Sequence, residues 1–521
     1  MTAWGMTVDL NRCVGCQTCT IACKHANATP PGVQWRKVID VEYGSFPDVQ
    51  RLFVVTGCQH CENPPCVPVC PTGATARRDD GLVTIDYDVC IGCASCVVAC
   101  PYQARSIQHE REWYYDEGAT AQEIQRPHEE RLGVANKCTF CIERIDDAIE
   151  RGLTPGVSLE STPACAASCI SQALKFGDLD DPESDVSRLV RDNKTFQMHE
   201  ELGTNPRVRY LYEVADTMPG RDLTSDDTDD AALSDLHNPL VGKRQTFWDY
   251  RAAMNFALGG MASGLAIVAW LAYLAGWIEA GKLQAGFASA GVIMAVGLFF
   301  VFMKLGRKAR FLFVLRRPQT SWMTRETYCV ALFYPAVAAS IVWAHPLAYS
   351  LAGLAAAGFL LSQAKILFMS KGIPAWRAPL VPWMLMATGI FEGAGLLALI
   401  TNGASAQLAG FAAAMGVLNA VIWRTYRRTG RASGIGPLSM RDIDGIAPVV
   451  LWMGYALPAA MFGMAVWSPT AALPAGMIAA AGGFFWKYAL VTQICHQQGF
   501  ALPKVPSRGS GTKAAPGSSL A

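Results

Sequence analysis

Charged residues are scarce in this chain of 521 residues, and acidic residues almost disappear from its second half. Only 17% of the residues are charged, against about 25% in a typical soluble domain. Residues 246–521 contain six acidic and 21 basic residues, whereas residues 1–245 contain 37 acidic and 23 basic residues, so the net charges are +15 and −14. This division excludes a single soluble enzyme, a disordered chain and an ordinary basic nucleic-acid-binding protein.

Cysteine is nearly absent from the second half, where only Cys329 and Cys495 occur; the other 16 lie between Cys13 and Cys169. The first 25 residues show neither a basic region followed by an apolar run nor a twin arginine, so we expect no export signal. Without export, a disulfide framework is not expected. The first half also lacks a nucleotide-binding loop, a flavin fingerprint and a group of catalytic carboxylates, which leaves the cysteines to supply its chemistry.

Sixteen cysteines form four groups of four. Their spacings are Cys13-x2-Cys16-x2-Cys19-x3-Cys23, Cys58-x2-Cys61-x4-Cys66-x3-Cys70, Cys90-x2-Cys93-x2-Cys96-x3-Cys100, and Cys138-x2-Cys141 followed later by Cys165-x3-Cys169. The first and third groups have the bacterial ferredoxin spacing, in which three cysteines bind one [4Fe–4S] cluster and the fourth binds its neighbour. Zinc is disfavoured because it usually takes two separated Cys-x2-Cys pairs per ion. Sixteen ligands therefore predict four [4Fe–4S] clusters.

In paired ferredoxin clusters, the last cysteine of each group binds the cluster of the other group, and this rule predicts the ligand sets. The adjacent second and third groups give one set of Cys58, Cys61, Cys66 and Cys100, and another of Cys90, Cys93, Cys96 and Cys70. By elimination, the outer groups give Cys13, Cys16, Cys19 and Cys169, and Cys138, Cys141, Cys165 and Cys23. The nearby Arg12, Arg105 and Lys137 are either cations that raise cluster potentials or solvated charges.

Residues 7–215 resemble the four-cluster iron–sulfur subunit of the dimethyl sulfoxide reductase group of molybdopterin oxidoreductases. The matching motifs are Asp9-Leu-Asn-Arg-Cys-Val-Gly-Cys, Cys58-Gln-His-Cys-Glu-Asn-Pro-Pro-Cys, Cys90-Ile-Gly-Cys, Lys137-Cys-Thr-Phe-Cys and His199-Glu-Glu-Leu-Gly-Thr-Asn-Pro. The resemblance implies an α+β double-ferredoxin-like iron–sulfur domain and supports the outer ligand pairing. It also implies a separate catalytic subunit that contains molybdopterin. One departure is Ile170 after Cys169, where the family usually has proline.

Eight apolar segments follow, each near the ~20 residues that span a bilayer. They lie at about 253–277, 285–303, 327–344, 347–369, 380–400, 406–423, 446–467 and 471–494. We therefore expect an all-α eight-helix transmembrane bundle after the iron–sulfur domain. The predicted domains are a tetra-[4Fe–4S] domain at 1–178, a polar acidic extension and linker at 179–245, a membrane anchor with a quinone site at 246–500, and a disordered tail at 501–521.

Lysine and arginine indicate how the chain lies in the membrane. They are concentrated in the even-numbered loops and at both ends of the membrane half, whereas the odd-numbered loops carry one basic residue, Lys282. The positive-inside rule places the basic loops and both ends in the cytoplasm. We therefore predict a multi-pass protein of the inner membrane whose iron–sulfur domain faces the cytoplasm.

The membrane half resembles the anchor subunit of the same reductase group, mainly in its helix number and in residues 304–326. The resemblance implies a quinone site that includes Lys304, Arg325 and Glu326, with lysine at 304 where the family has histidine. Glu392 is a further candidate because an ionisable residue inside a membrane helix is commonly functional. The alternatives are that Glu392 only pairs within the bundle and that lysines near helix ends, such as Lys487, extend to the membrane surface.

These features predict the electron-transfer and membrane-anchor subunit of an oxidoreductase. Electrons would pass through four clusters between a cytoplasmic molybdopterin subunit and a membrane quinone, menaquinone or ubiquinone. The orientation resembles that of sulfite dehydrogenase and phenylacetyl-CoA:acceptor oxidoreductase, and it favours substrate oxidation with quinone reduction. The alternatives are a quinol-oxidising anchor of a terminal reductase, a redox-coupled proton translocator, and a redox sensor or scaffold. We expect no catalytic residue in this chain and no nucleic-acid partner.

Overall fold

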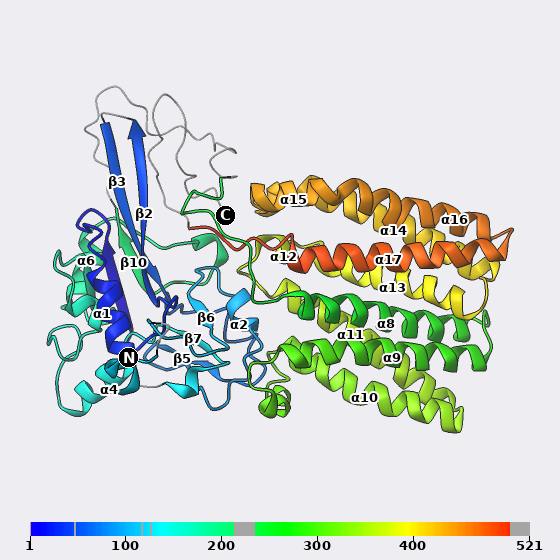
Figure 1. The fold of residues 1–521 in the computed structure, drawn as a ribbon, viewed down its shortest axis with the longest axis horizontal. Coiled ribbons are helices and arrows are strands. Elements are labelled where there is room, and N and C mark those ends of the chain that lie inside the picture. Colours follow the sequence, from blue (N-terminus) through cyan, green and yellow to red (C-terminus); the bar gives the residue numbers. More distant parts are fainter. Residues whose placement is uncertain (1, 46–47, 116–117, 126–127, 213–234, 501–521) are drawn as a thin grey trace. The chain divides into compact units, whose positions relative to one another are not determined.

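The computed structural model describes residues 2–45, 48–115, 118–125, 128–212 and 235–500 (Figure 1). Residues 213–234 of the predicted acidic linker and the predicted tail at 501–521 lie outside the described residues. The chain divides into two compact units. The first contains residues 1–68, 73–243 and 497–521, and the second contains residues 69–72 and 244–496.

A four-stranded sheet with the order β8–β1–β10–β9 lies in the first unit. Strand β1 (Trp4–Asp9) pairs in parallel with β10 (Val208–Leu211) and antiparallel with β8 (Leu174–Asp178), while β9 (Thr195–Phe196) pairs with β10. Alternate residues of a strand point to the same face, and the buried alternate pairs here are Met6 with Val8 and Val208 with Tyr210. The sheet therefore joins the two ends of the cysteine-rich region.

Three two-stranded ribbons and short helices complete the described part of the first unit. The ribbons pair β2 (Arg36–Ser45) with β3 (Asp48–Gly57), β4 (Thr75–Arg77) with β5 (Val83–Ile85), and β6 (Arg105–Ile107) with β7 (Ala135–Lys137). The helices are α1 (Thr18–Asn27), α2 (Ser95–Val98), α3 (Ala121–Gln125), α4 (Ile142–Glu150), α5 (Ala164–Ala167) and α6 (Asp185–Asp192), with 3-10 turns at Glu129–Arg131 and Glu200–Leu202. This is the mixture of strands and helices that the sequence predicts.

The second unit is helical, and Figure 1 shows its long helices side by side. Its helices are α8 (Tyr250–Leu274), α9 (Ala280–Lys304), α10 (Trp322–Trp343), α11 (Pro346–Phe368), α12 (Pro374–Arg377), α13 (Val381–Ile400), α14 (Ala406–Thr429), α15 (Pro437–Pro448), α16 (Leu457–Ala465) and α17 (Ala472–Thr492). A π-helical segment, Val449–Ala456, joins α15 to α16. Three 3-10 segments occupy Lys308–Arg316, Arg431–Ser433 and Pro469–Ala471.

Seven helices in the described part of the chain are long and apolar enough to cross a membrane. One of them is the continuous stretch Pro437–Ala465, which includes α15, the π-helical segment and α16. Helix α17 covers the eighth predicted segment but does not belong to the seven. Its sequence contains Lys487 and adjacent glycines at 482 and 483, which lower its hydropathy. The membrane-spanning character is therefore confirmed, and the predicted number of eight is not.

Helices α8 and α13 cross at backbone contact. A Cβ atom on Gly264 of α8 would lie 1.7 Å from the carbonyl oxygen of Gly389, and one on Gly393 would lie 2.1 Å from the carbonyl carbon of Gly264. Small residues at such crossings allow membrane helices to approach closely. The crossing brings the polar residues of α8 and α13 into the centre of the bundle.

Candidate iron–sulfur centres

Each of the four cysteine groups begins with the same backbone turn. Two residues after the first cysteine of each group, the chain has a positive φ: 68° at Gly15, 42° at His60, 69° at Gly92 and 57° at Phe140. Left-handed residues in such turns direct successive backbone N–H groups into a concave site that favours anions. Only the first and third groups share the ferredoxin spacing, yet all four share this turn.

The set predicted from the second and third groups is buried and mutually close. The thiols that interact electrostatically with Cys61 are those of Cys58, Cys66 and Cys100, and all four are buried. Burial raises the pKa of Cys100 to about 11 and the pKa of Cys61 well above its usual value. These groups are neutral thiols without metal, so iron binding must displace their protons.

The split fourth group meets the last cysteine of the first group. The Nδ2 atom of Asn27 lies 3.6 Å from Cys23 Sγ and 3.7 Å from Cys141 Sγ. Cys23 also interacts electrostatically with Cys138 and Cys165. The four members of this predicted set therefore lie together, although Cys23 and Cys165 are far apart in the sequence.

The remaining outer set lies beside it. Cys13 interacts electrostatically with Cys169 and Cys16, and Cys19 interacts with Cys165, Cys13 and Cys169. Cys16 is exposed, and Cys13 and Cys169 are partly exposed. This set thus lies at the surface of the described unit.

Contacts between sets indicate their order. Cys138 interacts electrostatically with Cys58, which places those two buried sets side by side. Arg105 interacts with both Cys66 and Cys96, which places the set of Cys96 beside that of Cys66. The order is therefore the Cys96 set, the Cys58 set, the Cys138 set and the Cys13 set.

Two fully buried guanidinium groups face the thiols. Arg105 donates hydrogen bonds to Cys66 Sγ at 3.0 Å and to Thr75 Oγ1 at 3.2 Å. Arg36 lies beside Cys165 and Cys138, and its Nε and Nη1 atoms have no hydrogen-bond partner among the described residues. Burial by itself would lower the pKa of both groups, but attraction to the surrounding sulfurs in their thiolate form raises the pKa of each above its usual value.

A buried cation requires a compensating negative charge, and thiolate-bound iron–sulfur clusters would supply it at these positions. The donor set and the buried cations therefore fit [4Fe–4S] clusters. Among the described residues, no three His, Cys, Asp or Glu side chains converge so as to hold a single metal ion.

Lys137 and His60 connect the second and fourth cysteine groups. Lys137 Nζ donates hydrogen bonds to the carbonyl oxygens of Val83 and Cys138. His60 Nδ1 accepts from the Val83 N–H at 3.1 Å, so its Nε2 carries the proton and donates to the Cys138 carbonyl at 3.1 Å. The His60 ring also stacks on Phe140 at 3.9 Å, and burial lowers its pKa well below the usual value.

The structure thus distinguishes among the basic residues that the sequence left ambiguous. Arg105 and Lys137 are buried beside the cysteines, whereas Arg12 is exposed and donates to the Ser171 carbonyl. Sequence reasoning missed Arg36, because nothing in the sequence separates it from the other arginines of the polar half. Its role follows from the pairing of β2 with β3, which begins at Arg36 and Gly57 beside the second cysteine group.

The predicted quinone residues lie on three helices, α9, α10 and α13. Glu326 in α10 is buried, with the side chains of Asn255 and Gln363 within hydrogen-bonding reach. Glu392 in α13 instead forms an ion pair with Lys487 of α17, with 2.6 Å between Oε2 and Nζ. Lys487 therefore points into the bundle and does not extend to its end.

The other two predicted quinone residues, Arg325 and Lys304, interact with groups in a loop and at a helix end. Arg325 donates to the carbonyl oxygens of Pro318 and Gln319 at 2.8 Å and 2.6 Å. Lys304 is buried at the end of α9 and interacts electrostatically with Asp249. Of the four predicted residues, Glu326 and Glu392 are therefore the two that lie inside the bundle with buried polar neighbours.

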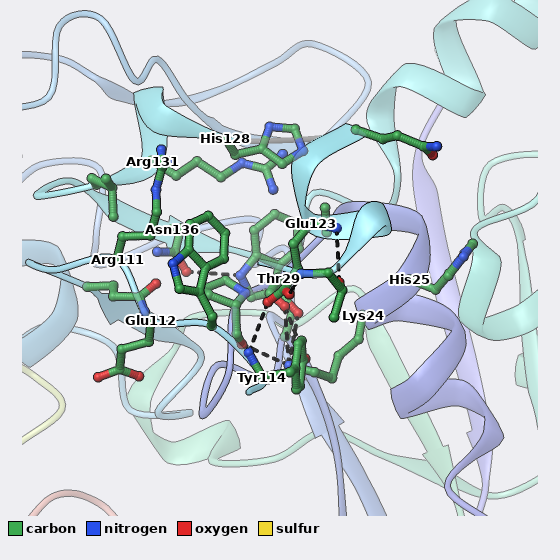
Figure 2. Close-up of a pocket in the computed structure, with 18 of the residues that line it drawn as sticks. Lys24, His25, Thr29, Arg111, Glu112, Tyr114, Glu123, His128, Arg131 and Asn136 are labelled. Carbon is green, nitrogen blue, oxygen red and sulfur yellow. Dashed lines mark hydrogen bonds between the residues drawn. The ribbon is translucent and has the colours of Figure 1, made fainter. Parts of the chain in front are cut away.

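A cavity of about 470 Å³ in the first unit is lined by α1 and by residues 108–136 (Figure 2). Its cations are already engaged. Lys24 Nζ donates to the carbonyl oxygens of Pro30 and Val33, each at 2.9 Å, and Arg111 pairs with Glu129 at 2.7 Å. No cysteine lines this cavity, so it is separate from the predicted cluster sites.

Comparison with known proteins identifies the cysteine-rich part. Residues 49–115 match the family described as the 4Fe-4S dicluster domain. The chain is 39% identical to a protein provisionally named as a dimethyl sulfoxide reductase iron–sulfur subunit from Halobacterium salinarum, over 42% of this chain and 82% of the relative. It is 40% identical to a selenate reductase subunit of Mesobacillus selenatarsenatis, over 40% of this chain and 71% of the relative.

A third relative is a sulfite dehydrogenase subunit of Allochromatium vinosum, which is 37% identical over 40% of this chain and 83% of its own length. These matches confirm the predicted resemblance and the presence of iron–sulfur clusters. The chain belongs to the electron-transferring iron–sulfur subunits of the dimethyl sulfoxide reductase family of oxidoreductases, and it carries in addition a helical half with seven helices able to span a membrane.

Proposed function

We propose that this chain is the electron-transfer and membrane-anchor subunit of a molybdopterin oxidoreductase. It holds four [4Fe–4S] clusters and passes electrons between a separate catalytic subunit and a membrane quinone. The observation that carries this proposal is the single row of the four cysteine sets, in which the two middle sets are buried and each end set has a cysteine with exposed surface. A row with two accessible ends is what electron transfer between two partners requires.

Each cluster, when bound, supplies one-electron transfer. The chain's own residues position it and adjust its potential. Arg105 and Arg36 place buried positive charge beside the ligands, which stabilises the more negative, reduced form and raises the potential. Asn27 donates toward the Cys23 and Cys141 sulfurs, which has the same effect at the neighbouring set.

At the membrane end, Glu326 is the quinone-site residue that we propose. Quinone reduction takes up protons, and a buried carboxylate with amide neighbours can hold a proton beside the ring. The distribution of Lys and Arg supports an inner-membrane location with the clusters on the cytoplasmic side. That orientation supports oxidation of a cytoplasmic substrate with reduction of the quinone.

The reverse direction is the second candidate. The relatives include a selenate reductase subunit and a sulfite dehydrogenase subunit, so the family contains subunits of enzymes that work in either direction. In the reverse case this chain would oxidise quinol and supply electrons to a terminal reductase. The two directions differ in whether added quinol reduces the clusters at a rate that supports turnover.

Metal content and partner identity test the proposal directly. The tagged chain, purified gently from membranes, should carry about sixteen iron atoms and retain a large subunit that contains molybdenum or tungsten. Full iron content without such a partner, under conditions that preserve membrane complexes, would contradict the assignment and favour the proton translocator or the redox sensor.

Two substitutions test the clusters and the quinone site independently. Cys96→Ser should abolish quinone-linked activity while the chain stays in the membrane. Glu326→Gln should lower quinone turnover by roughly 10²-fold while the iron content stays unchanged. Normal turnover in the Glu326 variant would remove this residue from the quinone site.

A further inference from the structure

A buried ion pair lies in the middle of the bundle, between α13 and α17. Glu392 Oε2 and Lys487 Nζ are 2.6 Å apart, and the two side chains are 0% and 1% exposed. Lys487 Nζ also donates to the Ala257 carbonyl of α8 at 3.0 Å. Such a pair is costly, because the loss of hydration offsets most of its attraction, and apolar replacements are often at least as stable. Stability alone therefore gives little reason for it.

The hydrogen bonding around this pair is incomplete. Glu392 Oε1 has no hydrogen-bond partner among the described residues, and the same holds for Glu326 Oε1 and Asn255 Oδ1. Most buried polar atoms in proteins are hydrogen-bonded, so these three open acceptors need an explanation. A carboxylate oxygen that accepts no hydrogen bond is available to accept a proton.

A neighbouring polar network in the same bundle is complete by contrast. Thr388 Oγ1 donates to Asn419 Oδ1 at 3.0 Å, accepts from Trp486 Nε1 at 3.2 Å, and contacts the Tyr455 hydroxyl at 3.0 Å. This arrangement uses the one donor and two acceptor positions of a hydroxyl. It is a structural network, and it shows that the open atoms near Glu392 are not a general property of the bundle.

Glycines make room between the ion pair and Glu326. The Cβ position of Gly260 in α8 lies 2.9 Å from Lys487 Nζ and 3.8 Å from Gln363 Oε1. The lysine and the amide are therefore at most about 7 Å apart, a gap that one or two water molecules linked by hydrogen bonds of ~2.8 Å can bridge. Gln363 in turn lies within reach of Glu326. In α17, a Cβ atom on Gly483 would lie 2.1 Å from Glu392 Oε1. Any larger residue at this position would therefore clash with the carboxylate.

We propose that Glu392 and Lys487 form a proton-relay pair that supplies Glu326 during quinone turnover. The relay rests on the proposed quinone site at Glu326 but assigns a separate function to a separate pair of residues. The pair is buried, bridges three helices and connects to the Glu326 carboxylate through Gln363. The other acidic residues in the described membrane helices, Asp442 and Asp444, belong to α15 and pair there with Arg244 and Arg427.

The relay balances protons and charge. Reduction of a quinone to a quinol takes two electrons, which the clusters supply, and two protons. For each proton, an N–H bond of the Lys487 ammonium breaks as bridging water accepts the proton. The water, oriented by Gln363, gives one of its own protons to Glu326, which passes it to a quinone oxygen. Glu392 then takes up a proton from the aqueous phase at Oε1, its carboxyl group turns about the Cγ–Cδ bond, and the O–H transfers the proton to the neutral Lys487 amine. The pair then returns to carboxylate and ammonium.

The test uses the full chain in liposomes with its clusters reduced by dithionite, which is removed before mixing. Decylubiquinone is then added, and the visible absorbance of the clusters reports their reoxidation. The double variant Glu392→Gln/Lys487→Met removes both charges together, so it leaves no unpaired buried charge. It should reoxidise roughly 10²-fold more slowly than the wild type, with normal iron content and normal reoxidation by ferricyanide. The matched control Glu279→Gln/Lys282→Met makes the same changes at the N-terminal end of α9 and should leave the rate unchanged.

A wild-type rate in the Glu392/Lys487 double variant would overturn the relay and leave the quinone assignment standing. Failure of decylubiquinone to reoxidise the wild-type clusters would overturn both. If the double variant does not assemble, the reoxidation rates of the wild type are compared in H2O and D2O. The relay requires reoxidation by decylubiquinone to be slower in D2O and reoxidation by ferricyanide to be unchanged. Equal decylubiquinone rates in H2O and D2O would exclude rate-limiting proton transfer and overturn the relay.

Discussion

Buried cations beside cysteine thiols are the residue-scale feature that most directly influences electron transfer. Arg105 is 5% exposed and donates to Cys66 Sγ at 3.0 Å. A hydrogen bond to a charged group contributes about 1.5–3 kcal/mol. Because such a donor stabilises the reduced cluster more than the oxidised one, it raises the potential.

Arg105→Met should therefore lower the potential of the cluster bound by Cys66, by an amount on the order of 100 mV. Redox titration of the purified chain, followed by electron paramagnetic resonance, measures the change. Arg105→Lys retains the charge and should show a smaller fall, while Arg188→Met on the exposed face of α6 serves as the control. An unchanged potential in Arg105→Met, with full iron content, would contradict this role.

The four cysteine groups and their turns were predictable from sequence, because the spacing is local and each group encodes its own turn. The buried cations were not. The sequence alone does not show which of Arg12, Arg36 and Arg105 is buried. The long-range pairing of strands buries Arg36 and Arg105 beside cysteine thiols. The same limit applies to Lys487, because its position near a helix end predicts a lysine at the surface. In the structure its side chain instead points into the bundle, where it contacts α8 and pairs with Glu392 of α13.

At the scale of single elements, the crossing of α8 and α13 depends on glycine. Gly264→Ala should disrupt it, because the added Cβ would lie 1.7 Å from the Gly389 carbonyl oxygen. We expect a loss of about 1–3 kcal/mol of stability, measured as the fraction of monodisperse chain that survives stepwise heating in detergent. Gly410→Ala in α14 is the control, since no atom lies within 4 Å of its Cβ position. Equal losses in both variants would contradict the packing explanation.

The start of α8 provides a pH-dependent prediction. Asp249 caps this helix by accepting from the Arg251 backbone N–H at 2.9 Å. Burial opposes its ionisation, but hydrogen bonds from Arg251 outweigh this and hold its pKa below the usual 3.8. A carboxylate with a lowered pKa in the folded state stabilises the fold above its unfolded pKa, and that stabilisation is lost as pH falls through the folded value.

Asp249→Asn keeps a good capping side chain but removes the charge. The wild type should therefore have the higher thermal midpoint at pH 7, and the difference should shrink as the pH falls below about 4. A difference that is the same at both pH values would show that the charge of Asp249 contributes nothing.

At the scale of the whole molecule, charge divides the chain into a polar acidic part and an apolar basic part. Lys and Arg at alternate loops predict that the iron–sulfur domain faces the cytoplasm. Protease added to inverted membrane vesicles should therefore release the cysteine-rich part, whereas right-side-out vesicles should protect it. The opposite result would place the clusters on the outer side and reverse the proposed location of the catalytic partner.

The sequence by itself determined the cofactor class, the four cysteine groups and the membrane-spanning half, because spacing and hydropathy are local properties that neighbouring residues encode. The tertiary structure alone decided the order of the cysteine sets, the burial of Arg36 and Arg105, and the pairing of Glu392 with Lys487, 95 residues away. These features depend on which distant segments pack together, and a buried charge is tolerated only where that packing brings it a partner.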